Sequence, residues 1–430
     1  SLVSKYFILI FLFLYGCSLN PNSKFWSETK KANVDNSVSK VLFKSKKPNE
    51  SEFNQQLKIT LPKVKKYKFD NLSNNDGFVN FLSFNENLSK YKFNRIEKFS
   101  SFEPELLVSN NSLIFFDDKG TLIKFNELSK VLWKKNYYSK SDKKSQPILF
   151  LASENNNIFV ADTAANYYVV DDFTGDLKWK KKHSSSFNSQ IKIKNGKVFV
   201  VDLENTLRCF SIKDGKTIWS VPTDLTIVSS QKKQSIIIDK NTVYFTNSIG
   251  DITAVDFETG EIIWQTPTQN IEFSTNITLR TSDLITDGET LFFSNNKNEF
   301  FAIDMQTGIL KWKQEINSEL RPVTISNYIV TVTNEGLLVV LDKNNGNILR
   351  INDILKNIKQ KKRKEYLPSG FIIGSLNLYL TTNNGRLFII NFKDSKIDKI
   401  LKLDKEKIQR PVFFKGKLYI AKDNSIIKIN

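Results

Sequence analysis

The sequence has few of the residues on which most enzyme chemistry depends. It contains one histidine, His183, and one methionine among its 430 residues, and it has no G-x-S-x-G motif. A catalytic triad would have to use that single histidine as its base, and a metal site normally needs several His, Cys or carboxylate ligands close together. We therefore expect His183 to be a solvated loop residue, and we predict no catalytic residue, no metal ligand and no cofactor.

Cysteine is almost as scarce, with only Cys17 and Cys209 in the chain. Cys17 ends an apolar N-terminal stretch, which leaves Cys209 as the one thiol of the remaining sequence, so no internal disulfide is expected. Cys209 lies in the segment TLRCFSI, which reads as a strand, and we predict a buried, small hydrophobic side chain there. The fold must then be stabilised by packing.

The longest apolar run, YFILIFLFLY at residues 6–15, is too short to span a bilayer as a helix. A lysine precedes it and Gly16 follows it, as in a secretory signal peptide. The tetrapeptide Leu14-Tyr15-Gly16-Cys17 resembles the lipobox of bacterial lipoproteins, although Tyr15 replaces the usual small residue. The resemblance implies that Cys17 is lipidated and anchors the protein to the periplasmic face of the outer membrane. An ordinary signal peptide is the alternative.

The chain carries a formal net charge of +18, from 63 Lys and Arg against 45 Asp and Glu. A basic total is compatible with a nucleic-acid partner or an anionic surface. Here the lysines are scattered over strands and loops, and no nucleic-acid-binding module accompanies them, so we predict no nucleic-acid partner. The cluster Lys361-Lys362-Arg363-Lys364 is interpreted as a solvated loop, with contact to anionic lipid or to an acidic partner as the alternative.

What the sequence does contain is a repeat, seen most clearly in residues 243–264, VYFTNSIGDITAVDFETGEIIW. Its β-branched and aromatic runs predict three short strands, and its Asn, Ser, Thr and Gly residues predict the turns between them. Gly260 is expected to adopt a positive φ at the end of a tight turn, with Asp256 and Thr259 bonding back to the turn backbone. The outgoing strand then places Trp264 on a buried face.

The same pattern recurs along the chain, with successive tryptophans 40 to 48 residues apart. In two further copies Arg350 and Lys399 take the place of the tryptophan, Ser395 replaces the glycine of the second, and a last copy ends at Asn430 before its fourth strand. A period in the forties with four strands per copy predicts an all-β fold, an eight-bladed β-propeller of four-stranded antiparallel blades. The repeat residues expected to have structural roles are Trp133, Trp179, Trp219, Trp264, Trp312, Gly175, Gly215, Gly260, Gly308 and Gly346.

The repeat frame divides the chain into three parts. We predict a signal peptide with a lipobox-like end at residues 1–17, a mostly disordered polar tether at 18–88, and the propeller at 89–430. Residues 89–99 alternate like a strand, and we expect them to complete the last blade and close the ring. Part of the tether, around Phe69 to Phe84, is a candidate to pack on the propeller. A short helix is expected in the loop at 351–368.

The repeats resemble the PQQ-like, or quinoprotein-type, propeller repeat. The resemblance is carried by the turns D-D-F-T-G, D-F-E-T-G and D-M-Q-T-G, each followed four residues later by a tryptophan. The family includes quinoprotein dehydrogenases and a non-enzymatic group, the BamB lipoproteins of the outer-membrane β-barrel assembly machinery. The lipobox-like start, the eight repeats and the abrupt end of the chain are similar to the BamB group, and the resemblance covers about residues 89–430.

The resemblance to the BamB group implies a non-enzymatic periplasmic scaffold, a monomer within a complex, that assists assembly and insertion of outer-membrane β-barrel proteins. Its partners would be the barrel-inserting subunit and nascent outer-membrane proteins. The family contact pattern L-x-L-R matches Leu225 and Ile227, while Val228 stands where the arginine would be, and Arg280 in a neighbouring loop is the candidate to replace it. Packing at the start of the next blade is the alternative role for Leu225 and Ile227.

Two other functions stay open from the sequence. One is a PQQ-dependent dehydrogenase of the quinoprotein type, although the chain lacks the vicinal cysteine pair that those enzymes often carry. The other is a generic periplasmic binding propeller without a role in assembly. In this second case the loops that connect the blades would still carry the function, because loops present variable side chains on a rigid scaffold.

Overall fold

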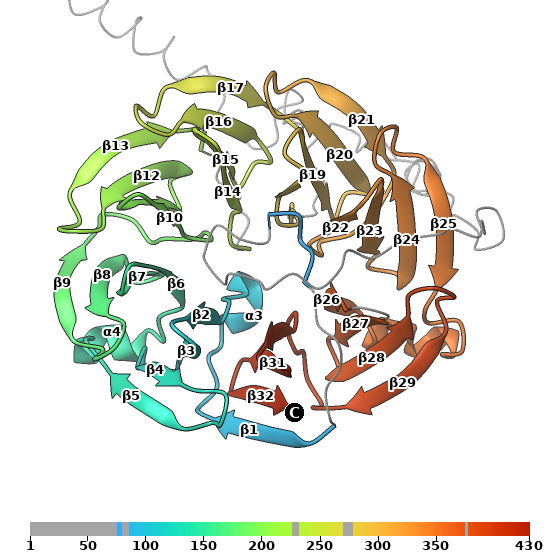
Figure 1. Ribbon diagram of the computed structural model, residues 1–430, viewed down its shortest axis with the longest axis horizontal. Helices are drawn as coiled ribbons and strands as arrows, with labels where there is room; N and C mark the ends of the chain where they lie inside the picture. Colours follow the sequence, from blue (N-terminus) through green and yellow to red (C-terminus); the bar gives the residue numbers. More distant parts are fainter. Residues whose placement is uncertain (1–74, 80–85, 226–231, 270–277, 375–376) are drawn as a thin grey trace, which may run out of the picture. The chain divides into compact units, whose positions relative to one another are not determined.

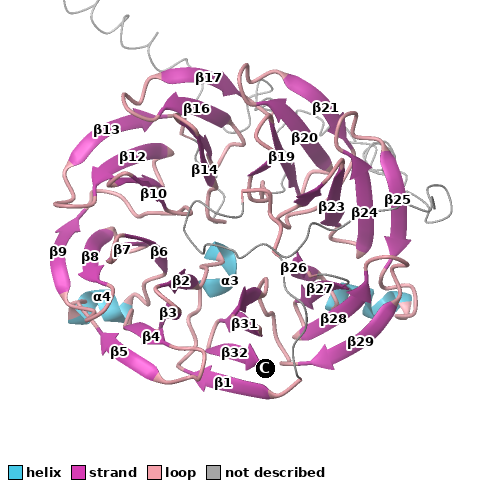
Figure 2. Cartoon of the chain, in the orientation of Figure 1, coloured by secondary structure: helices cyan, strands magenta, loops and turns pink. Residues whose placement is uncertain are grey.

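The computed structural model describes residues 75–79, 86–225, 232–269, 278–374 and 377–430. These residues form eight four-stranded antiparallel sheets arranged as the blades of a β-propeller (Figure 1). The first strand of each repeat is innermost and the fourth lies at the rim, and helices are few and short (Figure 2). The predicted all-β, eight-bladed architecture is confirmed.

Each blade is built from four strands that follow one another in the chain, except the last. Blades 1 to 4 comprise β2 (Leu107–Ser109), β3 (Ser112–Phe116), β4 (Leu122–Phe125), β5 (Val131–Lys135); β6 (Leu149–Glu154), β7 (Asn157–Asp162), β8 (Asn166–Asp171), β9 (Leu177–Lys182); β10 (Lys192–Lys194), β11 (Lys197–Val201), β12 (Thr206–Ser211), β13 (Thr217–Pro222); β14 (Ile236–Asp239), β15 (Thr242–Thr246), β16 (Ile252–Asp256) and β17 (Ile262–Thr266). Blades 5 to 8 comprise β18 (Ile285–Thr286), β19 (Thr290–Asn295), β20 (Glu299–Asp304), β21 (Leu310–Gln314); β22 (Val323–Ile325), β23 (Tyr328–Val332), β24 (Leu337–Asp342), β25 (Ile348–Asp353); β26 (Pro368–Ile373), β27 (Asn377–Thr382), β28 (Arg386–Asn391), β29 (Ile397–Lys402); β30 (Val412–Phe414), β31 (Lys417–Lys422), β32 (Ser425–Ile429) and β1 (Leu88–Lys92).

The last blade takes its outer strand from the other end of the propeller sequence. Strand β1 pairs antiparallel with β32, so that Leu88 lies opposite Ile429 and Lys92 lies opposite Ser425. The predicted closure by an N-terminal strand is confirmed, and it pairs the outer edge of β32, which would otherwise end an incomplete blade. The strand is shorter than the predicted 89–99, because the chain leaves the sheet after Lys92 and forms the one-turn helix α3 (Phe99–Phe102) near the centre of the ring (Figure 1).

Burial along each blade follows from its place between two others. The second and third strands are covered on both faces by neighbouring blades, so they are nearly continuous hydrophobic runs, as in the fully buried β3. The rim strands are covered less and alternate, as in β5, where Trp133 is buried between exposed residues. The core is therefore a set of clusters between adjacent blades, one of which joins side chains of blades 3 and 4.

A β-bulge recurs at one position in blades 1 to 7. The pairing of the third and fourth strands shifts directly after the residue opposite the repeat tryptophan or its replacement, as between Ala254 and Val255 beside Trp264. A bulge bends the strand and changes the direction of the adjacent side chains. The repeated bulge therefore presents the same rim position of each blade to the next blade.

Because the four strands of a blade alternate in direction, its connections lie on two opposite faces. The loops between blades and the hairpins between second and third strands share one face, which we call the connection face. A hydrogen bond from His183 N to Ala165 O, 2.7 Å long, joins two such loops. The hairpins between first and second strands and the turns between third and fourth strands share the other, which we call the turn face.

Residues 75–79 lie across the innermost strands. Asn75 O and Asp76 O accept hydrogen bonds from Thr286 N of β18 and Thr324 N of β22, at 2.7 and 2.9 Å. Phe78 is buried against blades 6 and 7. This part of the expected packing between residues 69 and 84 is therefore observed, and the rest of that segment lies outside the described residues.

Two short helices lie in loops between blades, α4 (Lys140–Lys144) and the 3-10 helix η3 (Gln360–Glu365). The helix expected in the loop at 351–368 is present, but it begins at Gln360, after the apolar segment that suggested it. That segment instead completes β25 to Asp353 and buries Ile354 and Leu355 in turns. Within the described ranges, no helix has the length and apolar character needed to cross a bilayer.

Candidate functional site

At the rim, the repeat tryptophans lie against glycines of the next blade. Gly308 has a φ of +72°, and a Cβ added to it would lie 2.5 Å from the ring of Trp264. L side chains rarely adopt this φ and the ring leaves no space, so glycine alone fits under the indole. The same contact joins the other pairs, Trp133 with Gly175, Trp179 with Gly215, Trp219 with Gly260, and Trp312 with Gly346.

Four of the five indole N–H groups also donate to a backbone carbonyl of the turn that the ring covers. Trp264 Nε1, for example, donates to Met305 O at 2.9 Å. Trp219 differs, because its indole nitrogen is buried without a hydrogen-bond partner among the described residues. The tryptophans are thus packed between blades and are not presented to a ligand. The remaining bonds are Trp133 to Asp172, Trp179 to Ile212, and Trp312 to Lys343.

The two copies without tryptophan use charged side chains at the same place. The guanidinium of Arg350 donates to the carbonyls of Phe392 and Lys393 at 3.3 and 3.2 Å and contacts the hydroxyl of Ser395. Lys399 forms an exposed ion pair with Glu86, just before β1. Blades 6 and 7 therefore also contact the next blade at the rim, but through a charged side chain where the earlier blades use an indole.

The repeated aspartates stabilise their own turns. Asp171 Oδ1 accepts hydrogen bonds from the backbone N–H groups of Phe173 and Thr174, at 2.9 and 3.0 Å. The bond from Thr174 is the main reason that the pKa of Asp171 is lowered. Asp256 makes the same bonds with the same effect on its pKa. A carboxylate engaged in this way is a turn element and a poor general base.

Two of the residues expected to contact a partner, Leu225 and Arg280, lie in connections between blades, on the connection face. Leu225 follows β13 and is 66% exposed, with no role in the core. Ile227 lies outside the described residues. Arg280 precedes β18 and is only partly exposed, because its Nε donates to Glu319 at 2.8 Å and its Nη2 to Glu103 at 3.4 Å.

Arg280 belongs to a larger group of charges at the axis. Lys407 Nζ donates to the same Glu103 oxygen at 3.1 Å. Burial alone would raise the pKa of Glu103, but Lys407 and the nearby Lys232, Lys233 and Arg280 outweigh it and lower that pKa to about 2. The glutamate is therefore ionised at neutral pH, and the guanidinium of Arg280 is engaged with two carboxylates of this chain.

Further charges of the axis stand directly before the innermost strands. Arg321 donates to Asp283 at 2.9 and 2.7 Å and to Glu105 at 2.7 Å, and Lys233 lies 3.8 Å from Glu105. This group of charges was not predicted from the sequence. A signal was nevertheless present, since several of its members flank the prolines that open repeats. These are Glu103 and Glu105 beside Pro104, Arg321 before Pro322, and Arg410 before Pro411.

His183 and Cys209 have structural surroundings. His183 was expected to be solvated, but its ring stacks on Phe187 with centroids 4.9 Å apart, and its Nε2 lies 3.0 Å from Asp202. The expectation was wrong because the ring packs against an aromatic side chain and contacts a buried carboxylate, which also accepts a hydrogen bond from Arg208. Cys209 is buried as expected, and burial raises the pKa of its thiol to about 12, which leaves it unreactive.

The basic cluster at 361–364 lies in η3, on the connection face. Its three lysines are exposed, and Arg363 forms an ion pair with Asp353 at 2.8 Å. The cluster is thus a solvated surface group with one residue that stabilises its loop. Among the predicted site residues that the structure describes, none contacts the cluster.

The axial carboxylates are the natural place to test for a metal. The quinoprotein enzymes that share the repeat use Ca²⁺ ligands, and Ca²⁺ requires several available oxygen donors. Here Glu103, Glu105 and Asp283 each contact Lys or Arg side chains. Across the described ranges, no group of three His, Cys, Asp or Glu side chains is arranged to hold a metal ion. The donor set does not fit a Ca²⁺-bound quinone.

Solved structures with the same fold include proteins of different function. BamB from Moraxella catarrhalis is 16% identical, with a TM-score of 0.64, over 80% of this chain and all of that one. The computationally designed protein Ika8 is 13% identical, with a TM-score of 0.57, over 76% of this chain and 98% of that one. Quinohemoprotein alcohol dehydrogenase from Comamonas testosteroni is 10% identical, with a TM-score of 0.57, over 82% and 78%.

At these identities the structural matches establish the fold alone, and no curated protein matches the sequence at a significant level. The family comparison goes further. The model described as outer membrane protein assembly factor BamB matches residues 76–352, well over half of the chain. That range begins at the segment that crosses the innermost strands and ends in the rim strand of blade 6. The chain therefore belongs to the BamB family of PQQ-repeat β-propellers.

Proposed function

We propose that the protein is a non-enzymatic, periplasmic scaffold of the outer membrane. In this proposal it assists the assembly and insertion of outer-membrane β-barrel proteins through protein–protein contacts of its propeller loops. Cys17 carries the lipid anchor, and the barrel-inserting subunit is the main partner. Nascent outer-membrane proteins are further candidates for contact.

The observation that carries the proposal is family membership over most of the propeller. The chemistry of the described residues agrees with a scaffold. The repeated aspartates are engaged in turns, the thiol is buried and the lone histidine packs against Phe187. What the fold presents to solvent is a rigid surface with variable loops, and loops on a rigid scaffold are suited to binding.

Leu225 is the residue through which we propose the partner contact. A leucine that is 66% exposed on the connection face contributes little to the fold and is available to a partner. Such apolar side chains become important at an interface when the partner excludes water around them. Arg280 is a weaker candidate, since contact with a partner would compete with its bonds to Glu103 and Glu319.

Co-purification from solubilised outer membranes tests the proposal. The tagged full chain should retain the barrel-inserting subunit, and Leu225→Asp should reduce the retained amount at least about tenfold, as expected for a central apolar contact. Leu128→Asp is the matched control, because Leu128 is 76% exposed but lies in a turn on the turn face. Absence of the subunit with the unaltered chain would refute the assembly role, and equal retention by both variants would remove Leu225 from the contact.

The anchor needs its own measurement. Metabolic labelling with a radioactive fatty acid should label the unaltered chain and not Cys17→Ser. In membrane fractionation, the Cys17→Ser variant should then be found in the soluble periplasmic fraction, whereas the unaltered chain should be found with the outer membrane. Labelling that persists in Cys17→Ser would place the lipid elsewhere.

The quinoprotein alternative makes a different prediction. A dehydrogenase would bind pyrroloquinoline quinone only with Ca²⁺, and would reduce an electron-accepting dye when given an alcohol. We expect neither, because the axial carboxylates are already paired with Lys and Arg. A Ca²⁺-dependent thermal shift together with dye reduction would refute the scaffold proposal and show that the protein is a dehydrogenase.

A further inference from the structure

A cavity of about 500 Å³ lies on the axis, where the eight innermost strands converge. Its wall includes residues from every innermost strand or the connection before it, together with residues 75–79 and the segment after α3. The volume is within the range of protein sites for small molecules. The cavity is distinct from the exposed loop surface that carries Leu225.

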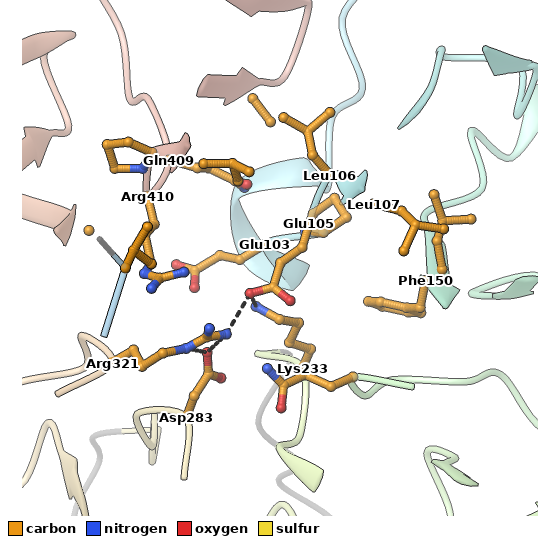
Figure 3. Close-up of a pocket in the computed structure, with 18 of the residues that line it drawn as sticks. Glu103, Glu105, Leu106, Leu107, Phe150, Lys233, Asp283, Arg321, Gln409 and Arg410 are labelled. Carbon is orange, nitrogen blue, oxygen red and sulfur yellow. Dashed lines mark hydrogen bonds and ion pairs between the residues drawn. The ribbon is translucent and has the colours of Figure 1, made fainter. Parts of the chain in front are cut away.

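The cavity has an apolar side and a charged side (Figure 3). Leu106, Leu107 and Phe150 line one side, and Arg321, Gln409 and Arg410 lie toward the other. Six cationic and four anionic side chains are among the lining residues, so the wall as a whole has an excess of positive charge. A wall of this kind suits a molecule with one apolar and one anionic part.

The two arginines on the charged side differ in how far they are neutralised. Arg321 donates to both Asp283 and Glu105. Arg410 instead donates from Nε to the carbonyl of Phe371 at 3.2 Å, and its Nη2 is buried without a hydrogen-bond partner among the described residues. Burial and the charge of Arg321 lower the pKa of Arg410 to about 9. Among the described residues no carboxylate forms an ion pair with this guanidinium, although Glu105 and Asp283 are near enough to favour its charged form.

Gln409 adds a second donor at the same end of the cavity. Its side chain is 8% exposed, and its Nε2 is buried without a hydrogen-bond partner within the described ranges. Buried donors without a partner are costly, and native proteins have few of them. Oδ1 of Asp283 also has no hydrogen-bond partner in the described part of the chain, but it belongs to a carboxylate that Arg321 already neutralises.

We propose that the axial cavity binds a small amphiphilic carboxylate. Its carboxylate accepts hydrogen bonds from Arg410 and Gln409, and its hydrocarbon chain lies against Leu106, Leu107 and Phe150. Arginine and carboxylate form strong, charge-assisted hydrogen bonds, and the apolar wall excludes water from them. The inference depends on the cavity alone, so it stands or falls separately from the assembly role.

Calorimetric titration of the full chain with three probes tests the ligand class. Decanoate carries both parts of the proposed ligand, decan-1-ol lacks the charge, and acetate lacks the chain. We expect decanoate to bind at least tenfold more tightly than either of the others. Equal binding of decanoate and decan-1-ol, or of decanoate and acetate, overturns the proposal, as does no binding of decanoate.

Variants test the assigned residues. Arg410→Gln should weaken decanoate at least tenfold and change decan-1-ol less than twofold. Arg386→Gln is the control, since Arg386 is also half-buried and donates to backbone carbonyls, but lies outside the cavity lining. Gln409→Leu provides a second measurement if Arg410→Gln does not fold, with an expected loss of at least threefold for decanoate. Undiminished decanoate binding in a folded Arg410→Gln or Gln409→Leu variant contradicts the assignment.

Discussion

The rim and the axis of the propeller join the same eight blades by different chemistry. At the rim, five indole rings cover five glycines, and the contact repeats from blade to blade with nearly the same geometry. At the axis, ten charged side chains surround one cavity; six of the blades, or the connections before them, supply these charges, and blades 2 and 7 supply none. The rim contacts are largely neutral and the axial contacts are ionic.

The difference separates what every blade must do from what this protein does. A contact that recurs in blade after blade keeps neighbouring sheets in one orientation, and so belongs to the architecture. The charged side chains at the axis do not recur from blade to blade, so a blade can form without them. Because buried ion pairs contribute less stability than apolar packing of similar volume, the axial charges are better explained by specificity or binding. The comparison makes the rim the structural region and the axis the functional candidate.

The largest expected effect comes from adding one methyl group at the rim. Gly308→Ala should lower the free energy of unfolding by about 3 kcal/mol, because the Cβ meets the ring of Trp264 and the backbone has a positive φ. Gly416→Ala separates these causes, since Gly416 has a φ of +77° with nothing within 4 Å of an added Cβ. It should cost about 1 kcal/mol. Equal losses for the two variants in urea unfolding would show that the tryptophan contact adds nothing.

The next effect belongs to the axis and depends on pH. The pKa of Glu103 in the folded protein is about 2, below its ordinary value of 4.5, so the ionised carboxylate stabilises the fold above pH 4.5. Glu103→Gln should therefore lower the free energy of unfolding by about 3 kcal/mol at pH 7. The difference between the variant and the unaltered chain should disappear as the pH falls from about 4.5 to 2.

Glu406→Gln is the matched control for that measurement. Glu406 pairs with Arg95 at 2.7 Å, but both side chains are about half exposed. Solvent screens an ion pair of this kind, so little change is expected at any pH. If both variants lose the same stability, or if the loss in Glu103→Gln does not vary with pH, the axial network does not stabilise the protein as described.

The fold could be predicted from the sequence because its information is repeated. Each copy specifies the same turn, bulge and rim contact, so a decayed copy is still recognised by its spacing from the others. The closing strand could also be predicted, since the last copy lacks one strand and an early segment with strand-like alternation is available to complete that blade. The end of that strand at Lys92 could not, because α3 is formed by packing of Phe99 and Phe102 near the axis and not by a local signal.

The axis could not be predicted in the same way because its residues come from connections of different length. Asp283 and Arg321 are 38 residues apart in the chain, yet they bond. No spacing rule joins them. His183 illustrates the same limit, since a histidine followed by serines is typical of an exposed loop until Asp202 and Phe187 are placed beside it. The charged residues beside the repeat prolines can be seen in the sequence. That they lie close together at the axis follows only from the closure of the propeller.

The smallest of the three effects tests whether a tryptophan at the rim requires a glycine in the turn that it covers. Where Arg350 replaces the tryptophan, Ser395 replaces the glycine and retains a φ of +57°. Arg350→Trp alone should lose about 2 kcal/mol of unfolding free energy, because the indole meets the Cβ of Ser395 as it would at Gly308. Adding Ser395→Gly should recover most of it and give an interaction energy of more than about 1 kcal/mol in a double-mutant cycle. Additive effects of the two substitutions would mean that tryptophan and glycine recur together by descent and not because one requires the other.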